Sequence, residues 1–310
     1  MQFEFENAFL HFARTGAPRG FVWRYALAYL LVTLLFGGVM ALLFGGWYVD
    51  MFSAVASDDP QAVIETTQMS GSMMALIYLV VLPLSLLFYA VFEAAYLRRY
   101  MRRDRFRLRL GADEWRVFVV LLIWMVAFIA STIVIAIAIA LAVLFVGIAM
   151  GSLESETGPP TAFMLIGTLS YIAVFVGLGA LAVRFSPAAA LTIRDRRVRF
   201  FEAWRATKGK FWTLFGAYAA WLALAMVAYI VVMAVFMVIL MPVMGGMESV
   251  EAPDMSFPPA LLALMALLYL AMLVASALFY YVWAGPAALA AKTYAPGLED
   301  GTKAIASELS

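Results

Sequence analysis

The chain has 310 residues, of which 65% are hydrophobic and 13% are charged, and its net charge is +1. Soluble domains carry about 25% charged residues, so this composition excludes a water-soluble fold and indicates a chain that folds in lipid. The sequence has no cysteine and a single histidine, His11. These counts exclude disulfides, thiol nucleophiles and multi-histidine metal sites, and we expect neither a cofactor nor a metal.

Six long uncharged stretches follow one another along the chain. The shortest has 25 residues, between Arg24 and Asp50, and the longest have 37, as between Lys210 and Glu248. About 20 apolar residues cross a bilayer as a helix, and 37 residues are too few for two crossings and a turn. The sequence therefore predicts an all-α membrane protein with six transmembrane helices. The stretches are 25–49, 66–92, 117–153, 157–183, 211–247 and 255–291.

The basic residues mark one side of the membrane. All 21 lysines and arginines fall in four segments, whereas the three loops between these segments hold nine acidic residues and neither lysine nor arginine. The positive-inside rule then predicts that both termini are cytoplasmic, and we expect a multi-pass protein of a bacterial inner membrane. The basic segments are 14–24, 98–116, 184–210 and 292–303, and the acidic loops are 50–65, 151–160 and 244–259.

The end of the first span imitates a signal-peptidase site. "AVASDDP" (54–60) follows a basic segment and an apolar run of 25 residues. The apolar region of a signal peptide has roughly 7–15 residues. We therefore expect this first helix to stay uncleaved.

A tryptophan stands at the start of three of the spans. Each one follows a basic residue and a glycine, and a mostly apolar run comes after it. Tryptophan is enriched at membrane–water interfaces, so we predict that these residues anchor the spans there and that the glycines let the chain turn into the membrane. The tryptophans are Trp23, Trp115 and Trp212, and the glycines are Gly20, Gly111 and Gly209.

The returning spans share a second landmark. Phe92, Phe185 and Trp283 are each followed by a pair of alanines, at spacings of 93 and 98 residues, and the tryptophans at the other ends are spaced by 92 and 97. This period of about 95 residues predicts one domain built from three helical hairpins. Their approximate bounds are 1–100, 101–195 and 196–295, with a cytoplasmic tail at 296–310. Generic hairpins also begin with basic and aromatic residues, so chance likeness is the alternative.

The segments that precede the spans look interfacial. "FEFENAFLHFART" and "RRVRFFEAWRATKGK" place apolar residues on one helical face and polar or basic residues elsewhere. Short amphipathic helices of this kind lie in the headgroup region, and we predict such elbows on the cytoplasmic side. The middle counterpart, 105–110, alternates arginine with apolar residues, and this period of two is typical of an extended strand.

The two central basic segments are the strongest functional feature. Segments 98–116 and 184–210 each hold eight lysines or arginines, interleaved with aromatic residues. Each basic residue near an anionic leaflet contributes about 1 kcal/mol, which predicts the phospholipid bilayer and its anionic lipids as partner. Setting the topology explains part of this charge, and nucleic acid is not expected because lipid lies closer. The predicted headgroup residues are Arg102, Arg103, Arg105, Arg196, Arg197, Arg199, Arg205, Lys208 and Lys210.

Two charged residues lie within the returning spans. Glu93 and Arg184 flank the repeated aromatic position from opposite sides. They are candidates for a polar pair inside the bundle, and the alternative is that each side chain reaches the interface separately. A GxxxG sequence, "GIAMG" (147–151), suits both internal helix packing and self-association. A homo-oligomer and a membrane-protein partner therefore both stay open.

The segment "PAAALTIRDRRVRFFEAWRATKGKFWTLFG" (187–216) resembles a pattern in uncharacterised bacterial multi-pass membrane proteins. It is similar to the membrane domain found beside glycerophosphoryl diester phosphodiesterases, and "LRLGADEWRVFVVLLIW" (108–124) looks like the equivalent part of such membrane proteins. The resemblance covers about a third of the chain and implies an integral-membrane module. The catalytic barrel of those phosphodiesterases has no counterpart here, so no catalytic residue carries over.

These patterns favour a non-enzymatic membrane module that engages anionic lipid, or a membrane partner, through a basic cytoplasmic face. The alternative is a transporter or lipid-translocating protein with a path between the hairpin repeats. An intramembrane enzyme is disfavoured, because the usual nucleophile–base and metal constellations are missing from the sequence.

Overall fold

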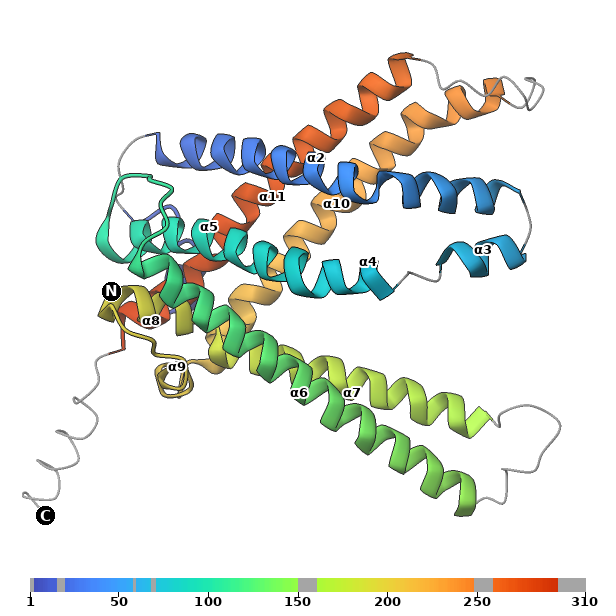
Figure 1. Ribbon diagram of the computed structural model, residues 1–310. Coiled ribbons are helices and arrows are strands. Elements are labelled where there is room, and N and C mark those ends of the chain that lie inside the picture. Colours follow the sequence, from blue (N-terminus) through green and yellow to red (C-terminus); the bar gives the residue numbers. More distant parts are fainter. Residues whose placement is uncertain are drawn as a thin grey trace, which may run out of the picture. The chain divides into compact units, whose positions relative to one another are not determined.

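A computed structural model describes residues 3–15, 20–57, 60–67, 71–149, 161–247 and 259–294. Across these ranges the chain is almost entirely helical and has no strand (Figure 1), which confirms the all-α prediction. The acidic loop 151–160, most of the loop 244–259, the end of "GIAMG" and the tail 296–310 lie outside the described residues.

Six helices in the described ranges are long and apolar enough to cross a membrane. The number agrees with the prediction, and the protein is a multi-pass membrane protein. The first of these helices continues through Ala54, within the sequence that imitates a cleavage site. The six spans are Phe21–Val55, Ile77–Arg102, Ala112–Ala142, Gly167–Asp195, Phe211–Ile239 and Leu262–Lys292.

The chain forms two compact units, and each is described by itself. Unit 1 comprises Met1–His11, Arg109–Tyr218 and Pro286–Ser310, and unit 2 comprises Phe12–Leu108 and Ala219–Gly285. Two helices, α10 (Phe211–Met247) and α11 (Pro259–Lys292), contribute residues to both units.

Unit 2 is held together by aromatic rings near the basic ends of its spans. Tyr25 lies at the centre, and its ring centroid is 5.8 Å from that of Phe92, 6.1 Å from Phe106 and 6.4 Å from Tyr281. Tyr100 stacks on Tyr281 at 5.2 Å and donates its hydroxyl hydrogen to the Tyr281 carbonyl at 2.8 Å. The remaining elements of this unit are α2 (Phe21–Ala56), α3 (Pro60–Thr67), α4 (Gly71–Leu76), a π-helical turn (Ile77–Val81) and α5 (Leu82–Arg102).

The π-helical turn ends two residues before a proline, Pro83. Pro83 has no N–H and its ring clashes with the carbonyl four residues earlier in a regular α-helix. A π-turn is a common way for a helix to absorb such a defect. The Ser85 hydroxyl donates to the Val81 carbonyl, at the end of this turn, at 2.7 Å.

The described part of unit 1 contains five further helices. α6 (Ala112–Ala149) and α7 (Thr161–Phe185) lie side by side, and α8 (Ala188–Asp195) contacts α6 (Figure 1). α1 (Phe5–Phe9) buries Ala8 against Ala217 of α10 and Leu289 of α11, so this side of the predicted interfacial helix contacts protein. The fifth is the short α9 (Glu202–Ala206), whose Trp204 ring lies 5.7 Å from that of Phe185, and the Phe185 ring stacks on that of Phe200 at 4.8 Å.

Left-handed residues mark the turns between helices. Gly20 has φ of 78° and Gly209 has φ of 74°, so both adopt a left-handed backbone shortly before α2 and α10, which is compatible with the predicted turning role. Gly111 differs, because its φ is not positive. Its N–H instead donates to the Glu114 carboxylate at 3.0 Å, and this bond caps the start of α6. Two arginines that follow helix ends, Arg103 and Arg196, have φ of 59° and 55°.

The segment 103–110 is neither helix nor strand. The period of two correctly excludes a helix there, but the expected strand does not form among the described residues, where the segment has no ladder partner. Phe106 ties it to α2, with its ring 5.5 Å from that of Phe21.

Candidate functional site

Residues 194–212, which overlap the third of the four basic stretches of the sequence, are called the basic segment from here on. In this segment buried small residues alternate with exposed cations and aromatic rings. Ala203, Ala206 and Thr207 are buried, and Thr207 donates its hydroxyl to helix carbonyls. This pattern fixes α9 and the following turn against unit 1. The side chains that point outward are Arg196, Arg197, Phe201, Trp204, Arg205, Lys208 and Trp212.

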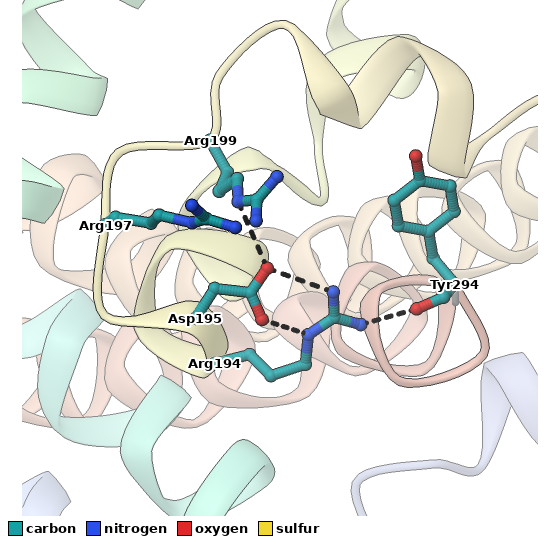
Figure 2. A pocket seen from close by; sticks show the side chains of 5 residues that line it. All are labelled: Arg194, Asp195, Arg197, Arg199 and Tyr294. Carbon is teal, nitrogen blue, oxygen red and sulfur yellow. Dashed lines mark hydrogen bonds and ion pairs between the residues drawn. The ribbon is translucent and has the colours of Figure 1, made fainter. Parts of the chain in front are cut away.

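An open pocket of about 510 Å³ lies at one end of this segment, as Figure 2 shows. It is lined by Arg194, Asp195, Arg197, Arg199 and Tyr294. Asp195 ends α8, and Tyr294 follows the end of α11. The pocket therefore lies where two predicted membrane spans end.

Arg194 joins these two helix ends. It forms a two-point ion pair with the neighbouring Asp195, at 2.7 and 3.2 Å. Its Nη1 donates to the carbonyls of Ala291 and, at 2.7 Å, Tyr294. The two carbonyls lie at and just beyond the end of α11, where carbonyl groups lack intrahelical N–H donors, and a cation there also interacts favourably with the helix dipole. The Arg194 guanidinium is thus used for structure.

Arg199 is nearly buried, with 12% of its side chain exposed, and two carboxylates neutralise it. Its Nε lies 3.3 Å from Asp195 and its Nη1 donates to Glu202. The bond to Glu202 raises the pKa of Arg199, because it stabilises the charged form. The structure therefore differs from the simple picture of a free headgroup cation at Arg199.

Arg197 is exposed and makes no hydrogen bond or ion pair with any residue that the structure describes. In Figure 2 its guanidinium lies beside Arg199 at the rim of the pocket. Tyr294 also lines the pocket, with its ring pointing away from the Arg194–Asp195 pair in Figure 2, and its described hydrogen bond is the one accepted by its backbone carbonyl. Arg197 and Tyr294 thus present donors that the ion-pair network does not use.

The other predicted headgroup residues divide into two groups. Lys210 is half-buried, and its Nζ donates to the Thr293 hydroxyl at 3.0 Å and lies 5.3 Å from the Phe3 ring centre. Arg102 is half-buried at the end of α5. The remaining ones are exposed: Arg103, Arg105, Arg196, Arg205 and Lys208.

The three predicted anchor tryptophans lie in the first turn of their helices. Trp23 is 72% exposed, Trp115 is 52% exposed and Trp212 is 78% exposed. Such exposure of a large ring is unfavourable in water and suits the boundary of a membrane. Their interfacial role stays a prediction, and their exposure is compatible with it.

Glu93 and Arg184 belong to different compact units, and their pairing stays a prediction. Within unit 1, Arg184 donates to the Thr207 carbonyl at 3.2 Å. Its guanidinium carbon also lies 5.1 Å from the Trp204 ring centre and 4.8 Å from that of Phe211. Arg184 therefore connects α7 to the basic segment.

Sequence reasoning missed the buried Arg99 of unit 2. Its guanidinium lies over the rings of Phe21, at 4.6 Å, and Tyr281, at 5.1 Å, while only 8% of the residue is exposed. Among the residues that the structure describes, its Nε and Nη1 have no hydrogen-bond partner. In the sequence it is one of several arginines in a row, and only the ring contacts set it apart.

Within the described ranges, no three histidine or acidic side chains come close enough to hold a metal ion. The guanidinium and hydroxyl groups of the residues that line the pocket are donors of the kind that bind anions. Comparisons with known protein families, with curated proteins and with solved structures found no match to this chain.

Proposed function

We propose that the chain is a non-enzymatic module of a bacterial inner membrane, with both termini cytoplasmic, that engages anionic lipid or a membrane partner through its basic face. The observation that carries this proposal is the basic segment of unit 1. Its exposed cations and exposed aromatic rings stand on the same short stretch, at the ends of predicted spans. Rings at the interface and cations toward phosphates are the combination that a headgroup layer attracts.

The exposed charge is sufficient for useful binding. Arg196, Arg197, Arg205 and Lys208 are exposed. At about 1 kcal/mol each near an anionic leaflet, they supply about 4 kcal/mol, which corresponds to roughly a thousandfold preference over a neutral surface. Arg199 and Arg194 add little to this sum, because nearby carboxylates balance their charge.

The threefold repeat is part of the proposal, and backbone conformation supports it. Arg103 and Arg196, both left-handed, are separated by the same 93 residues as Phe92 and Phe185. Gly20 and Gly209, also left-handed, each stand three residues before an anchor tryptophan. A left-handed arginine carries a steric cost, so its recurrence at equivalent positions favours common construction over chance.

The transporter alternative needs polar groups along a path through the membrane. The pocket between α10 and α11 in unit 2 has a volume of about 380 Å³ and is lined mainly by apolar side chains. Its serine, Ser276, donates to the Met272 carbonyl of its own helix at 2.8 Å. These features favour the lipid-engaging module over the transporter.

A charge-neutralised variant tests the proposal. The substitutions R196N, R197Q, R205Q and K208Q remove four exposed charges and leave the Arg194–Asp195–Arg199–Glu202 network intact. The full chain is extracted from bilayers of phosphatidylethanolamine and phosphatidylglycerol, and the retained lipids are quantified by mass spectrometry. We expect phosphatidylglycerol enrichment for the native chain and its loss in the variant.

The matched control replaces Arg196, Arg197 and Arg205 with lysine, which keeps the charge and should keep the enrichment. Because the chain has no cysteine, single introduced cysteines report whether topology is unchanged. Equal phosphatidylglycerol enrichment in the neutralised and native chains would remove the proposal.

A further inference from the structure

The charged side chains of the pocket in Figure 2 have a fixed arrangement, which a diffuse basic surface does not need. A surface that attracts anionic lipid by charge alone needs no fixed arrangement of its cations. Here the guanidinium of Arg199 is mostly buried and forms ion pairs with two carboxylates. The backbone N–H of Arg199 also donates to the Thr192 hydroxyl at 3.1 Å, which fixes the segment around it. Preorganised donors of this kind discriminate between anions by shape.

We infer that Arg197, Arg199 and the Tyr294 hydroxyl form a binding pocket for a phosphate group with three terminal oxygens, that is, a phosphomonoester. This inference rests on the proposed lipid engagement and names the headgroup chemistry that one site selects. Arg197 supplies an uncompensated fork of donors, Arg199 supplies a fixed guanidinium behind it, and Tyr294 adds a neutral donor from the end of α11. Guanidinium groups bind phosphate oxygens two at a time, and such charge-assisted bonds are the stronger ones.

The acidic residues do not prevent the binding of an anion. Asp195 accepts from Arg194 and ion-pairs with Arg199, and Glu202 accepts from Arg199. Together the three arginines and two carboxylates leave one positive charge, and it resides on Arg197. The ion-pair network thus fixes the pocket, and Arg197 provides its charge.

The size and place of the pocket fit a lipid headgroup. Ligand pockets typically have volumes of about 300–1,000 Å³, and this pocket has about 510 Å³ with a wide opening. It lies where the spans Gly167–Asp195 and Leu262–Lys292 end. Basic pockets between the ends of membrane helices are where phosphorylated headgroups bind. A free phosphate compound offers the same chemistry, and the experiment separates the two sources.

The test uses the purified full chain in detergent and native mass spectrometry to measure apparent affinities. The probes are short-chain phosphatidic acid, short-chain phosphatidylglycerol and inorganic phosphate, with short-chain phosphatidylcholine as the uncharged reference lipid. We expect the native chain to bind phosphatidic acid at least tenfold more tightly than phosphatidylglycerol. The R197Q variant should lose this preference, and Y294F, which changes no charge, should reduce it about fivefold.

Arg196 provides the matched control. It is exposed, adjacent and equally charged, but it does not line the pocket. Asparagine tolerates the left-handed backbone at this position, so R196N removes one charge without strain. We expect R196N to weaken both lipids alike and to keep the preference. Thermal stability of each variant shows that the fold is retained.

The outcomes separate the two proposals. The phosphomonoester site is overturned, while lipid engagement stands, if the native chain binds phosphatidic acid and phosphatidylglycerol equally. The same holds if R196N lowers the preference for phosphatidic acid as much as R197Q does. If no anionic lipid binds more tightly than phosphatidylcholine, both are overturned. Inorganic phosphate that displaces phosphatidic acid at comparable concentration supports the site with a soluble ligand, and its failure to do so supports the lipid.

Discussion

Replacing Arg184 with methionine tests how α7 is connected to the basic segment. The substitution keeps an unbranched stem and removes the guanidinium. The lost hydrogen bond to the Thr207 carbonyl is a charge-assisted one of 3.2 Å, worth about 1.5 kcal/mol. The contacts with the Trp204 and Phe211 rings, at 5.1 and 4.8 Å, add about 0.5 kcal/mol each at a half-exposed site. The sum is about 2.5 kcal/mol.

Thermal unfolding in detergent, followed by tryptophan fluorescence, measures this loss. For a chain of this size about 2.5 kcal/mol corresponds to a fall in Tm of about 4 °C. R184K should lie between the native chain and R184M, because lysine keeps the charge and loses the planar fork. The control R205M removes an exposed arginine and should change Tm very little. If R184M unfolds at the same temperature as R205M, the contacts described for Arg184 do not stabilise unit 1.

Three further outcomes follow from individual residues. Burial, together with the ammonium of Lys292, lowers the pKa of His11 from 6.5 to about 4. Because the folded state favours neutral His11, the docking of α1 should be complete above pH 6.5 and should weaken as the pH falls toward 4. Hydrogen exchange of residues 5–9 measures this docking, and the H11Q variant should remove its pH dependence. Gly209→Ala places a side chain at φ of 74° and should cost about 1–2 kcal/mol, whereas a helical glycine such as Gly38 should gain stability when replaced with alanine. Glu114→Ala removes the cap on α6 and should cost about 1 kcal/mol, with most of it retained in E114Q; equal melting curves for the two Glu114 variants would contradict the capping role.

The spans were predictable because a membrane-crossing helix needs a long run of apolar residues, and such a run can be read directly from the sequence. A helix that crosses a bilayer needs about 20 apolar residues, and the uncharged stretches after Arg24 and Lys210 provide them in an unbroken run. The turning roles of Gly20 and Gly209 were equally readable, since glycine alone adopts a left-handed backbone without cost. Gly111 is not left-handed, and the "DE" pair after it is a sign of a helix N-terminus.

The pocket was not predictable, because its parts meet only in the folded chain. Tyr294 and Arg194 are 100 residues apart. The spacing of Asp195, Arg199 and Glu202 suggests one face of a continuous helix, yet α8 ends at Asp195 and the left-handed Arg196 turns the chain. Composition therefore indicates a basic surface, but only the backbone turn shows which cations are neutralised and which stay available.

The lipid retained by the native chain tests the central claim most directly. The protein is gently extracted from a bilayer with a known ratio of phosphatidylethanolamine to phosphatidylglycerol, and native mass spectrometry counts the lipids that remain bound. Engagement of anionic headgroups by the basic segment predicts retained phosphatidylglycerol well in excess of its share of the bilayer, and the excess should fall as ionic strength rises. Retained lipid in the same ratio as the bilayer, at every ionic strength, would contradict the account.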